Sequence, residues 1–371
     1  MFEIPQNVGF VLDRLNQNGY KAYIVGGCVR DFLLSVTPHD FDITTSAKPQ
    51  EIMSLFEKTI PTGIKHGTVT VIENGEAIEV TTFRTEGAYT DNRRPDRVEF
   101  VDDLQKDLAR RDFTVNAMAY NSKEGVRDFF GGQKDLENRI LRAVGNPETR
   151  FSEDALRILR LFRFAATLNF KIEQKTFNSA IKKADLLKNV SRERISEELK
   201  KAVTGDNFKV FEPLISNGGL EFLNITKLPD FERIKKFNHN SLLCLYLVLG
   251  SEGLGELKPS NKEKEYFKTL DILKNMPLPE TDCDIKEMLN TATPDILKDY
   301  FALKGLPQKP LERVINSGEP YSIQHLKIDG NHLKNMGYKG EEIGRILEHL
   351  RKVVIAEPRK NTLSELLKEI P

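Results

Sequence analysis

Two carboxylates, Asp40 and Asp42, stand one residue apart in the segment DFDITT. Alternate side chains of an extended strand point to the same face, so this spacing places both carboxylates side by side. Such groups repel each other unless a cation lies between them, and Mg²⁺ prefers hard oxygen ligands together with substrate phosphates. The pair is therefore a candidate Mg²⁺ site, although a pair of this spacing on its own is more often a surface feature.

A glycine pair, Gly26-Gly27, precedes these carboxylates, between the apolar segment AYIV and the segment CVRDFLL that contains Arg30. Glycines let a backbone approach a phosphate closely, N–H groups at the start of a helix point toward it, and an arginine adds charged donors. The pattern GxxxxGK[ST] of a Walker loop is absent. The segment predicts a triphosphate site, and a plain turn is the alternative interpretation.

A third carboxylate, Glu79, lies in the segment AIEVTTF, where Ile78 and Val80 are expected on the opposite face of a strand. It could join Asp40 and Asp42 on the metal side and accept the proton of an attacking 3′-hydroxyl group. The solvated face of a hairpin would carry a glutamate equally well, so both interpretations stay open.

The stretch GGCVRDFLLSVTPHDFDIT strongly resembles the signature of the DNA polymerase β-like nucleotidyltransferase superfamily. More narrowly, it is similar to class II tRNA nucleotidyltransferases and bacterial poly(A) polymerases. The resemblance implies that Gly27 and Arg30 bind the nucleotide phosphates. It also implies that Asp40 and Asp42 hold two Mg²⁺ ions.

A second motif, RRDFTVNAMAY at residues 110–120, resembles the family segment that contacts the ribose, which implies that Arg111 and Asp112 are the contacts. A carboxylate can accept a hydrogen bond from a 2′-hydroxyl group and so favour ribonucleotides. A helix N-terminus with an ion pair is the alternative interpretation of the same residues.

The segment SEDALRILRLFRF, residues 152–164, predicts an amphipathic helix with Ser152 as its N-cap. Asp154 and Arg157 are neighbours on such a helix. A carboxylate beside a guanidinium complements the amino group and ring nitrogen that cytosine and adenine share, whereas uracil and guanine would leave polar groups unpaired. The pair could thus select CTP and ATP, and a simple ion pair is the alternative.

This segment also resembles the nucleotide-reading motif of the family, which implies that Asp154 and Arg157 select the base without a template. Arg160 could reach the triphosphate or the base. The resemblance includes Arg163 as well, although steps of three residues on an ideal helix place it about opposite Asp154. We therefore expect four of these residues to take part in nucleotide binding.

The elements that must position these residues change character along the chain. Residues up to about 148 alternate helix and strand patterns, with a hairpin across Asn74-Gly75, and helical periods follow. Together with the resemblance, these patterns predict an α+β chain with a polymerase-β-like nucleotidyltransferase head, a small mixed sheet with helices, and an all-helical remainder. The expected parts are a catalytic head at 1–148, a base-reading neck at 149–205, a body at 206–305 and a tRNA-binding tail at 306–371.

Two later segments carry further resemblance. SRERISEELKKAV, residues 191–203, resembles the motif after the reading helix, which implies that Arg194 and Glu198 brace that helix. Residues 328–350 resemble the tail of CCA-adding enzymes, which grips tRNA. Sequence-independent phosphate contacts are expected there from Lys334, Lys339 and Arg345.

Composition narrows the setting. The 371 residues carry zero net charge, so any surface for an anionic polymer must be a local patch. Three scattered cysteines make neither a disulfide framework nor a zinc pattern, which predicts a reducing, cytoplasmic setting. No apolar run approaches the length of a bilayer span, so we expect no membrane association.

The segment at residues 84–100 favours one activity within the family. CC-adding enzymes shorten this loop, and here it looks complete, which favours adding C, C and A from CTP and ATP to tRNA that lacks all or part of its 3′ CCA. An A-adding or CC-adding specialist and a bacterial poly(A) polymerase are the alternatives of the same fold. A non-catalytic RNA-binding protein and a transferase for another substrate are alternatives of other classes. The sequence leaves the oligomeric state open, and a homodimer is one option.

Overall fold

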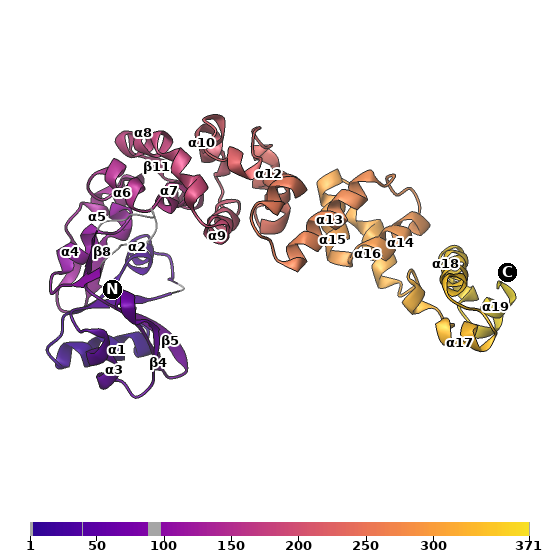
Figure 1. Cartoon of the computed structure of the whole chain (residues 1–371), viewed down its shortest axis with the longest axis horizontal. Helices are drawn as coiled ribbons and strands as arrows, with labels where there is room; N and C mark the ends of the chain where they lie inside the picture. The colour runs from indigo at the N-terminus through magenta and orange to yellow at the C-terminus, as the bar shows by residue number, and fades with distance from the viewer. Residues whose placement is uncertain (1–2, 39, 88–97, 371) are drawn as a thin grey trace. The chain divides into compact units, whose positions relative to one another are not determined.

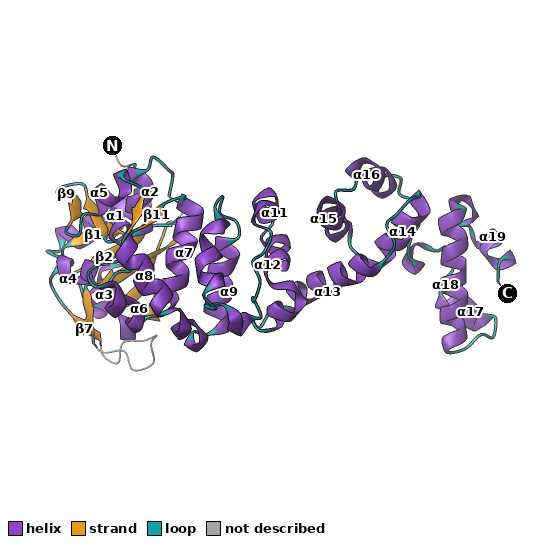
Figure 2. Cartoon of the chain, turned by 90° about the horizontal axis from the view of Figure 1, so that it is seen from above, coloured by secondary structure: helices purple, strands orange, loops and turns teal. Residues whose placement is uncertain are grey.

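The computed structural model describes residues 3–38, 40–87 and 98–370. The chain forms two compact units, Met1–Lys258 and Pro259–Pro371. Strands are confined to the first unit, and helices make up most of the remaining described residues (Figure 2). Residues 88–97, in the middle of the segment whose length favours full CCA addition, lie outside the described residues.

A mixed sheet forms the core of the N-terminal part (Figure 1). β2 runs parallel to β5, and the other neighbouring strands of this sheet run antiparallel. In spatial order the seven described strands are β3 (Thr59–Gly63), β4 (Thr68–Glu73), β5 (Glu76–Thr82), β2 (Asp42–Thr45), β1 (Ala22–Val25), β8 (Met118–Asn121) and β9 (Gly125–Asp128).

The predicted hairpin across Asn74-Gly75 is confirmed. β4 and β5 pair antiparallel, and both turn residues have positive φ, 52° and 83°, as a two-residue turn of the primed type requires. The central strand β1 is buried along its whole length, which explains why its sequence, AYIV, is continuously apolar. The prediction of an α+β head with a small mixed sheet therefore holds.

Helices cover this sheet and continue beyond it. They are α1 (Gln6–Gln17), α2 (Gly27–Leu33), α3 (Pro49–Leu55), α4 (Leu104–Ala109), α5 (Gly132–Glu137), α6 (Pro147–Glu153), α7 (Leu156–Leu168), α8 (Gln174–Lys182), α9 (Arg192–Ala202), α10 (Glu212–Ser216), α11 (Phe231–Lys236) and α12 (Ser241–Gly255). Two small sheets join β6 (Arg84–Glu86) to β7 (Val98–Phe100) and β10 (Ile140–Leu141) to β11 (Lys171–Ile172). The two-residue strand β11 is an exception to the all-helical remainder that the sequence predicts.

The second compact unit is helical throughout its described residues. It contains α13 (Asn261–Asn275), α14 (Asp282–Thr291), α15 (Pro294–Lys304), α16 (Gln308–Asn316), α17 (Gly330–Asn335), α18 (Glu341–Ala356) and α19 (Leu363–Lys368). A cluster of buried aliphatic side chains joins α17, α18 and α19, with Leu333, Leu350 and Leu366 fully enclosed. No helix among the described residues is long and apolar enough to cross a membrane.

Candidate active site

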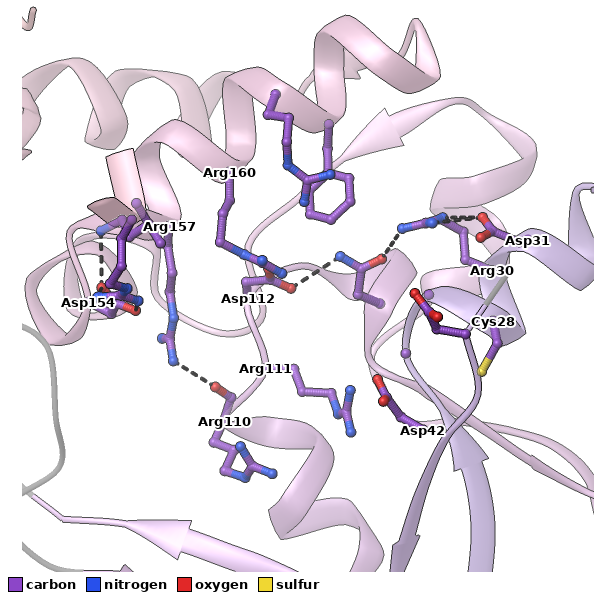
Figure 3. A pocket seen from close by; sticks show the side chains of 18 of the residues that line it. Cys28, Arg30, Asp31, Asp42, Arg110, Arg111, Asp112, Asp154, Arg157 and Arg160 are labelled. Carbon is purple, nitrogen blue, oxygen red and sulfur yellow. Dashed lines mark hydrogen bonds and ion pairs between the residues drawn. The ribbon is translucent and has the colours of Figure 1, made fainter. Parts of the chain in front are cut away.

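One pocket of about 760 Å³ in the first unit collects side chains from segments that are far apart in the sequence (Figure 3). The start of α2, the start of β2, the segment after α4, the break between α6 and α7, and α9 all contribute to it. Ten of the residues predicted from the sequence line this pocket: Gly27, Arg30, Asp40, Asp42, Arg111, Asp112, Asp154, Arg157, Arg160 and Arg163.

The pocket is strongly positive although the chain as a whole is neutral. Eight arginines and five aspartates line it, whereas the net charge of the chain is zero. A cleft lined by an excess of one sign of charge concentrates ligands of the opposite sign. The local patch that the neutral composition requires is therefore here, and a nucleoside triphosphate has the charge to match it.

One side of the pocket is formed by arginine side chains and by a backbone segment that lies close to them. Arg30, in α2, is buried and donates to Asp31 and to Asn116. The Nε atom of Arg111 is buried and has no hydrogen-bond partner among the described residues, and Asp107 at 3.9 Å is its nearest ion-pair partner. A buried guanidinium with a spare donor is a suitable site for an anionic oxygen.

Gly26 brings the backbone close to this side of the pocket. Its φ is +83°, and an added Cβ atom would lie 2.9 Å from a terminal nitrogen of Arg111. We expect Gly26→Ala to raise the KM for the nucleotide by about tenfold or more, because the methyl group displaces the guanidinium. Gly75→Ala is the control, because Gly75 has the same φ of +83° but open space around it. Equal effects of the two substitutions on KM would rule out this explanation.

Three carboxylates meet where β2 and β5 pair. Asp42 begins β2 and lies in register with Glu79 of β5. Loss of hydration near neighbouring groups raises the pKa of Asp42 although its surface is exposed, the charge of Arg111 opposes this, and repulsion by Asp40 adds to it. Loss of hydration also raises the pKa of Glu79, with Asp42 and Asp40 adding to the effect. A cation beside the carboxylates would relieve this repulsion.

Glu79 lies outside the main pocket. It lines a neighbouring pocket of about 740 Å³, and Asp40 and Asp42 line both pockets. No group of three or more His, Cys, Asp and Glu side chains among the described residues is arranged to hold a metal by itself. Asp40 and Asp42 are oxygen donors of the kind that Mg²⁺ binds together with waters and substrate oxygens.

Asp112 is fully engaged by protein donors. Its Oδ1 atom accepts from the Phe113 backbone N–H at 2.8 Å and from Asn116 Nδ2 at 3.2 Å, and its Oδ2 atom accepts from two nitrogens of Arg160 at 2.7 and 2.8 Å. A carboxylate has about four acceptor positions. A ribose hydroxyl group would therefore have to replace one of these donors, and the half-buried Arg160 has the most room to move.

The same contacts set the ionisation of Asp112. Burial opposes the charged form, but the charge and hydrogen bonds of Arg160, with those of Asn116 and Phe113, outweigh burial and lower the pKa to about 2. Because this value lies below the ordinary 3.8, the carboxylate contributes stability above about pH 4 and loses it as the pH falls toward 2.

Asp112→Asn tests this contribution. We expect the substitution to lower the free energy of unfolding at pH 7 by about 2 kcal/mol, and the difference from the wild type to shrink at pH 3. Urea denaturation at both pH values measures it. Asp185→Asn is the control, because the Asp185 side chain is 91% exposed. A difference that stays constant between pH 7 and pH 3 would contradict the assigned pKa.

The predicted reading helix is interrupted, which corrects the expectation of a continuous helix from Ser152. α6 begins earlier, at Pro147, with Asn146 as its N-cap, and it ends at Glu153. Asp154 is extended, with φ −138° and ψ 104°, and its carboxylate accepts from the Leu156 backbone N–H at the start of α7. The Asn-Pro pair, a strong start signal for a helix, was the overlooked feature.

Asp154 and Arg157 line the pocket without pairing with each other among the described residues. Arg194 of α9 donates to both carboxylate oxygens of Asp154, at 3.2 and 2.7 Å. Arg157 pairs with Glu153 at 2.8 Å and donates to the Arg110 carbonyl at 3.0 Å. Each of the two side chains is thus held by its own partners, and the simple ion pair that was the alternative interpretation is not formed among the described residues.

Arg163 reaches the pocket although an ideal helix would have placed it opposite Asp154. The break before α7 removes Asp154 from the helical register, so the two residues are no longer related by steps on one helix. Glu198 of α9 accepts from Arg163 at 2.5 Å and lies 3.5 Å from Arg160. The contacts of Arg194 and Glu198 agree with the predicted bracing of the reading segment.

Among the pocket residues that the sequence did not single out, Asn116 and Phe164 contact several of the predicted ones. Asn116 is buried between Arg30 and Asp112, and Phe164 has the guanidinium carbons of three arginines within 5.3 Å of its ring centre. Aromatic faces stabilise nearby cations, so Phe164 lets like charges gather. The only available signal was the presence of both residues inside the recognised motifs. The predicted RNA contacts Lys334, Lys339 and Arg345 are exposed in the second unit.

Comparisons with known proteins agree with this geometry. Residues 22–142 match the family described as the poly A polymerase head domain, and residues 169–229 match the one described as a probable RNA and SrmB-binding site of polymerase A. A CCA-adding enzyme of Lactobacillus delbrueckii subsp. bulgaricus is 50% identical over 95% of this chain and 94% of its own, and one of Ligilactobacillus salivarius is 37% identical over 93% and 91%. The crystal structure of the Bacillus stearothermophilus CCA-adding enzyme in complex with CTP superposes with a TM-score of 0.80 and 32% identity, over 98% of this chain and 96% of that one. The chain therefore belongs to the family of CCA-adding enzymes, with a polymerase-β-like head.

Proposed function

We propose that this chain adds C, C and A to the 3′ end of tRNA, using CTP and ATP and no nucleic-acid template. One observation carries the proposal: the predicted phosphate, carboxylate and base-reading residues line one positively charged pocket. The extensive identity to CCA-adding enzymes supports the choice of reaction. A non-catalytic RNA-binding protein would have no need of this combination.

The residues divide the work in space. Arg30 and Arg111 hold the triphosphate beside the Gly26 backbone, and Asp154 and Arg157 read the base from the break between α6 and α7. Asp40 and Asp42 lie at the boundary with the pocket that Glu79 lines. An in-line displacement needs the attacking group opposite the leaving pyrophosphate. The tRNA 3′-hydroxyl group therefore comes from the Glu79 side.

Asp40 and Asp42 are the residues that would hold Mg²⁺. Two such ions would increase the acidity of the attacking hydroxyl group and neutralise charge on the phosphates. The register of Asp42 with Glu79 supports a cation at this position, and the raised pKa values of both groups, to which repulsion between the carboxylates contributes, agree with it. Glu79 is placed to accept the proton of the hydroxyl group.

A direct assay tests the proposed activity. Purified protein is incubated with a tRNA transcript that lacks CCA, with CTP alone, ATP alone or both. We expect two added residues with CTP alone and three with both nucleotides. Long A-tails would identify a poly(A) polymerase, and a stop after two C residues with both nucleotides would identify a CC-adding specialist. Addition of A to a second transcript that already ends in CC, with no use of CTP on the first transcript, would identify an A-adding specialist. No transfer under any condition would favour a binding protein.

We further propose that the predicted parts 1–148, 149–205, 206–305 and 306–371 serve as head, neck, body and tail. The compact units divide the chain at Lys258 instead, so these parts are a proposal about roles. A homodimer and a cytoplasmic setting remain predictions from the sequence.

The exposed cations of the proposed tail give a prediction about tRNA binding. Replacing Lys334, Lys339 and Arg345 together by alanine should weaken tRNA binding. It should also lower the slope of log affinity against log salt concentration by about 2 to 3, because each phosphate contact releases a counterion. Electrophoretic mobility shift at several salt concentrations measures this. An unchanged slope would contradict the proposed contacts. The replaced residues are Lys334, Lys339 and Arg345, and the control replaces three exposed lysines of α13, Lys262, Lys264 and Lys268.

A further inference from the structure

We propose that Asn116 is a positioning residue that couples the phosphate side of the pocket to its sugar side. The proposal rests on the proposed nucleotidyl transfer. Asn116 ends a short 3-10 helix, Thr114–Asn116, and is only 5% exposed. It acts through Arg30 and Asp112, the two binding residues on either side of it.

The carboxamide of Asn116 makes one hydrogen bond to each of these residues. Its Oδ1 atom accepts from Arg30 at 2.7 Å, and its Nδ2 atom donates to Asp112 Oδ1 at 3.2 Å. A guanidinium can only donate and an ionised carboxylate can only accept. The two neighbours therefore fix the orientation of the amide, and the amide fixes the separation of the two neighbours.

Further contacts extend this link across the pocket. Asp112 accepts from Arg160, and Arg160 in turn lies 3.5 Å from Glu198 of α9. The chain of contacts thus runs from α2 beside the sheet to α9 in the helical part. In order, its members are Arg30, Asn116, Asp112, Arg160 and Glu198.

Asn116 is the uncharged residue in this series of five contacting residues. The effect of replacing it on nucleotide binding can therefore be predicted. An aspartate would still accept from Arg30 but would repel Asp112. A leucine of similar size would leave both neighbours without this partner. Because buried charged groups lose much when a partner is removed, either change should disturb nucleotide binding more than it disturbs the fold.

Two variants and two ligands test the coupling. In calorimetry at pH 8, Asn116→Leu should weaken the binding of CTP by about tenfold, and it should weaken inorganic tripolyphosphate as well, because Arg30 loses its partner. In transfer assays the preference for CTP over dCTP should fall severalfold, because Asp112 is less well held, while kcat at saturating CTP changes less than KM.

Asn116→Asp gives a readout that a purely structural role would not produce. Two neighbouring carboxylates at positions 112 and 116 would share one proton, and the protonated group could donate as the amide does. The CTP affinity of this variant, relative to the wild type at the same pH, should therefore be higher at pH 6 than at pH 9. The relative affinity of Asn116→Leu should not change with pH.

Asn121→Leu is the matched control, because Asn121 is also 5% exposed and bonds to the backbone of Ala22 outside the pocket. It should lower the melting temperature without changing CTP binding or sugar preference. The proposal is overturned if Asn116→Leu binds CTP as the wild type does, if it behaves like Asn121→Leu, or if Asn116→Asp shows no pH dependence. CTP binding needs no tRNA, so a wild type that binds CTP but adds nothing to tRNA would refute the proposed function and leave this test intact.

Discussion

Asp42→Ala is expected to lower the rate of nucleotide addition by about a thousandfold or more, because the carboxylate pair that would hold Mg²⁺ is reduced to a single group. Asp42 lines both pockets and lies in register with Glu79, so its loss removes the carboxylate that joins the two sides. Single-turnover addition to tRNA that lacks its terminal A measures the loss.

Binding of CTP separates a chemical defect from a folding defect. The arginines proposed to hold the triphosphate are unchanged in Asp42→Ala, so CTP should still bind in calorimetry. Asp13→Ala, which removes an exposed carboxylate of α1, should leave the rate unchanged. Near-normal addition by Asp42→Ala would remove the basis for placing the metal at this position.

Asp154→Asn is expected to cost about a hundredfold in the preference for CTP over UTP. The carboxylate offers acceptors to the base amino group, and an amide held by Arg194 presents a donor in place of one of them. Losing a match between buried polar groups has effects of this size or larger. The ratio of kcat/KM values for CTP and UTP measures it.

The direction of the change identifies its cause. Use of CTP and ATP should fall together while use of UTP changes little, because both bases share the feature that Asp154 recognises. Asp185→Asn, on a side chain that is 91% exposed, serves as the control. A uniform loss for all four nucleotides would indicate a structural role for Asp154 and contradict base reading.

Local patterns and motif spacing predicted much of this structure. The Asn74-Gly75 turn fixed the β4–β5 register. The parallel pairing of β5 with β2, which joins segments far apart in the sequence, placed Glu79 opposite Asp42. The resemblance to a known family added residues such as Arg163 that an ideal helix would have excluded. Both kinds of prediction concern features that a short stretch of sequence carries by itself.

Contacts between distant segments were harder to predict. The break at Asp154 depends on Asn146 starting α6 early and on Arg194 holding the freed carboxylate, 40 residues away in the sequence. Asn116 joins Asp112 to Arg30, which lies 86 residues before Asn116, and its side chain has no chemistry of its own to single it out. Such roles depend on tertiary packing, which periodicity and spacing do not encode.

The extended residue between α6 and α7 has a consequence for how base choice can change. The two proposed base-reading residues are attached to different supports, because Arg157 belongs to α7 whereas Asp154 is held by Arg194 of α9. Their spacing therefore follows the packing of α9 against α7. Just after α9 ends, a Cβ atom on Gly205 would come within 2.7 Å of the Ala166 backbone of α7. Substitutions at this contact between helices, which lies away from the pocket, would change the preference among nucleotides more than they change the rate of nucleotide addition.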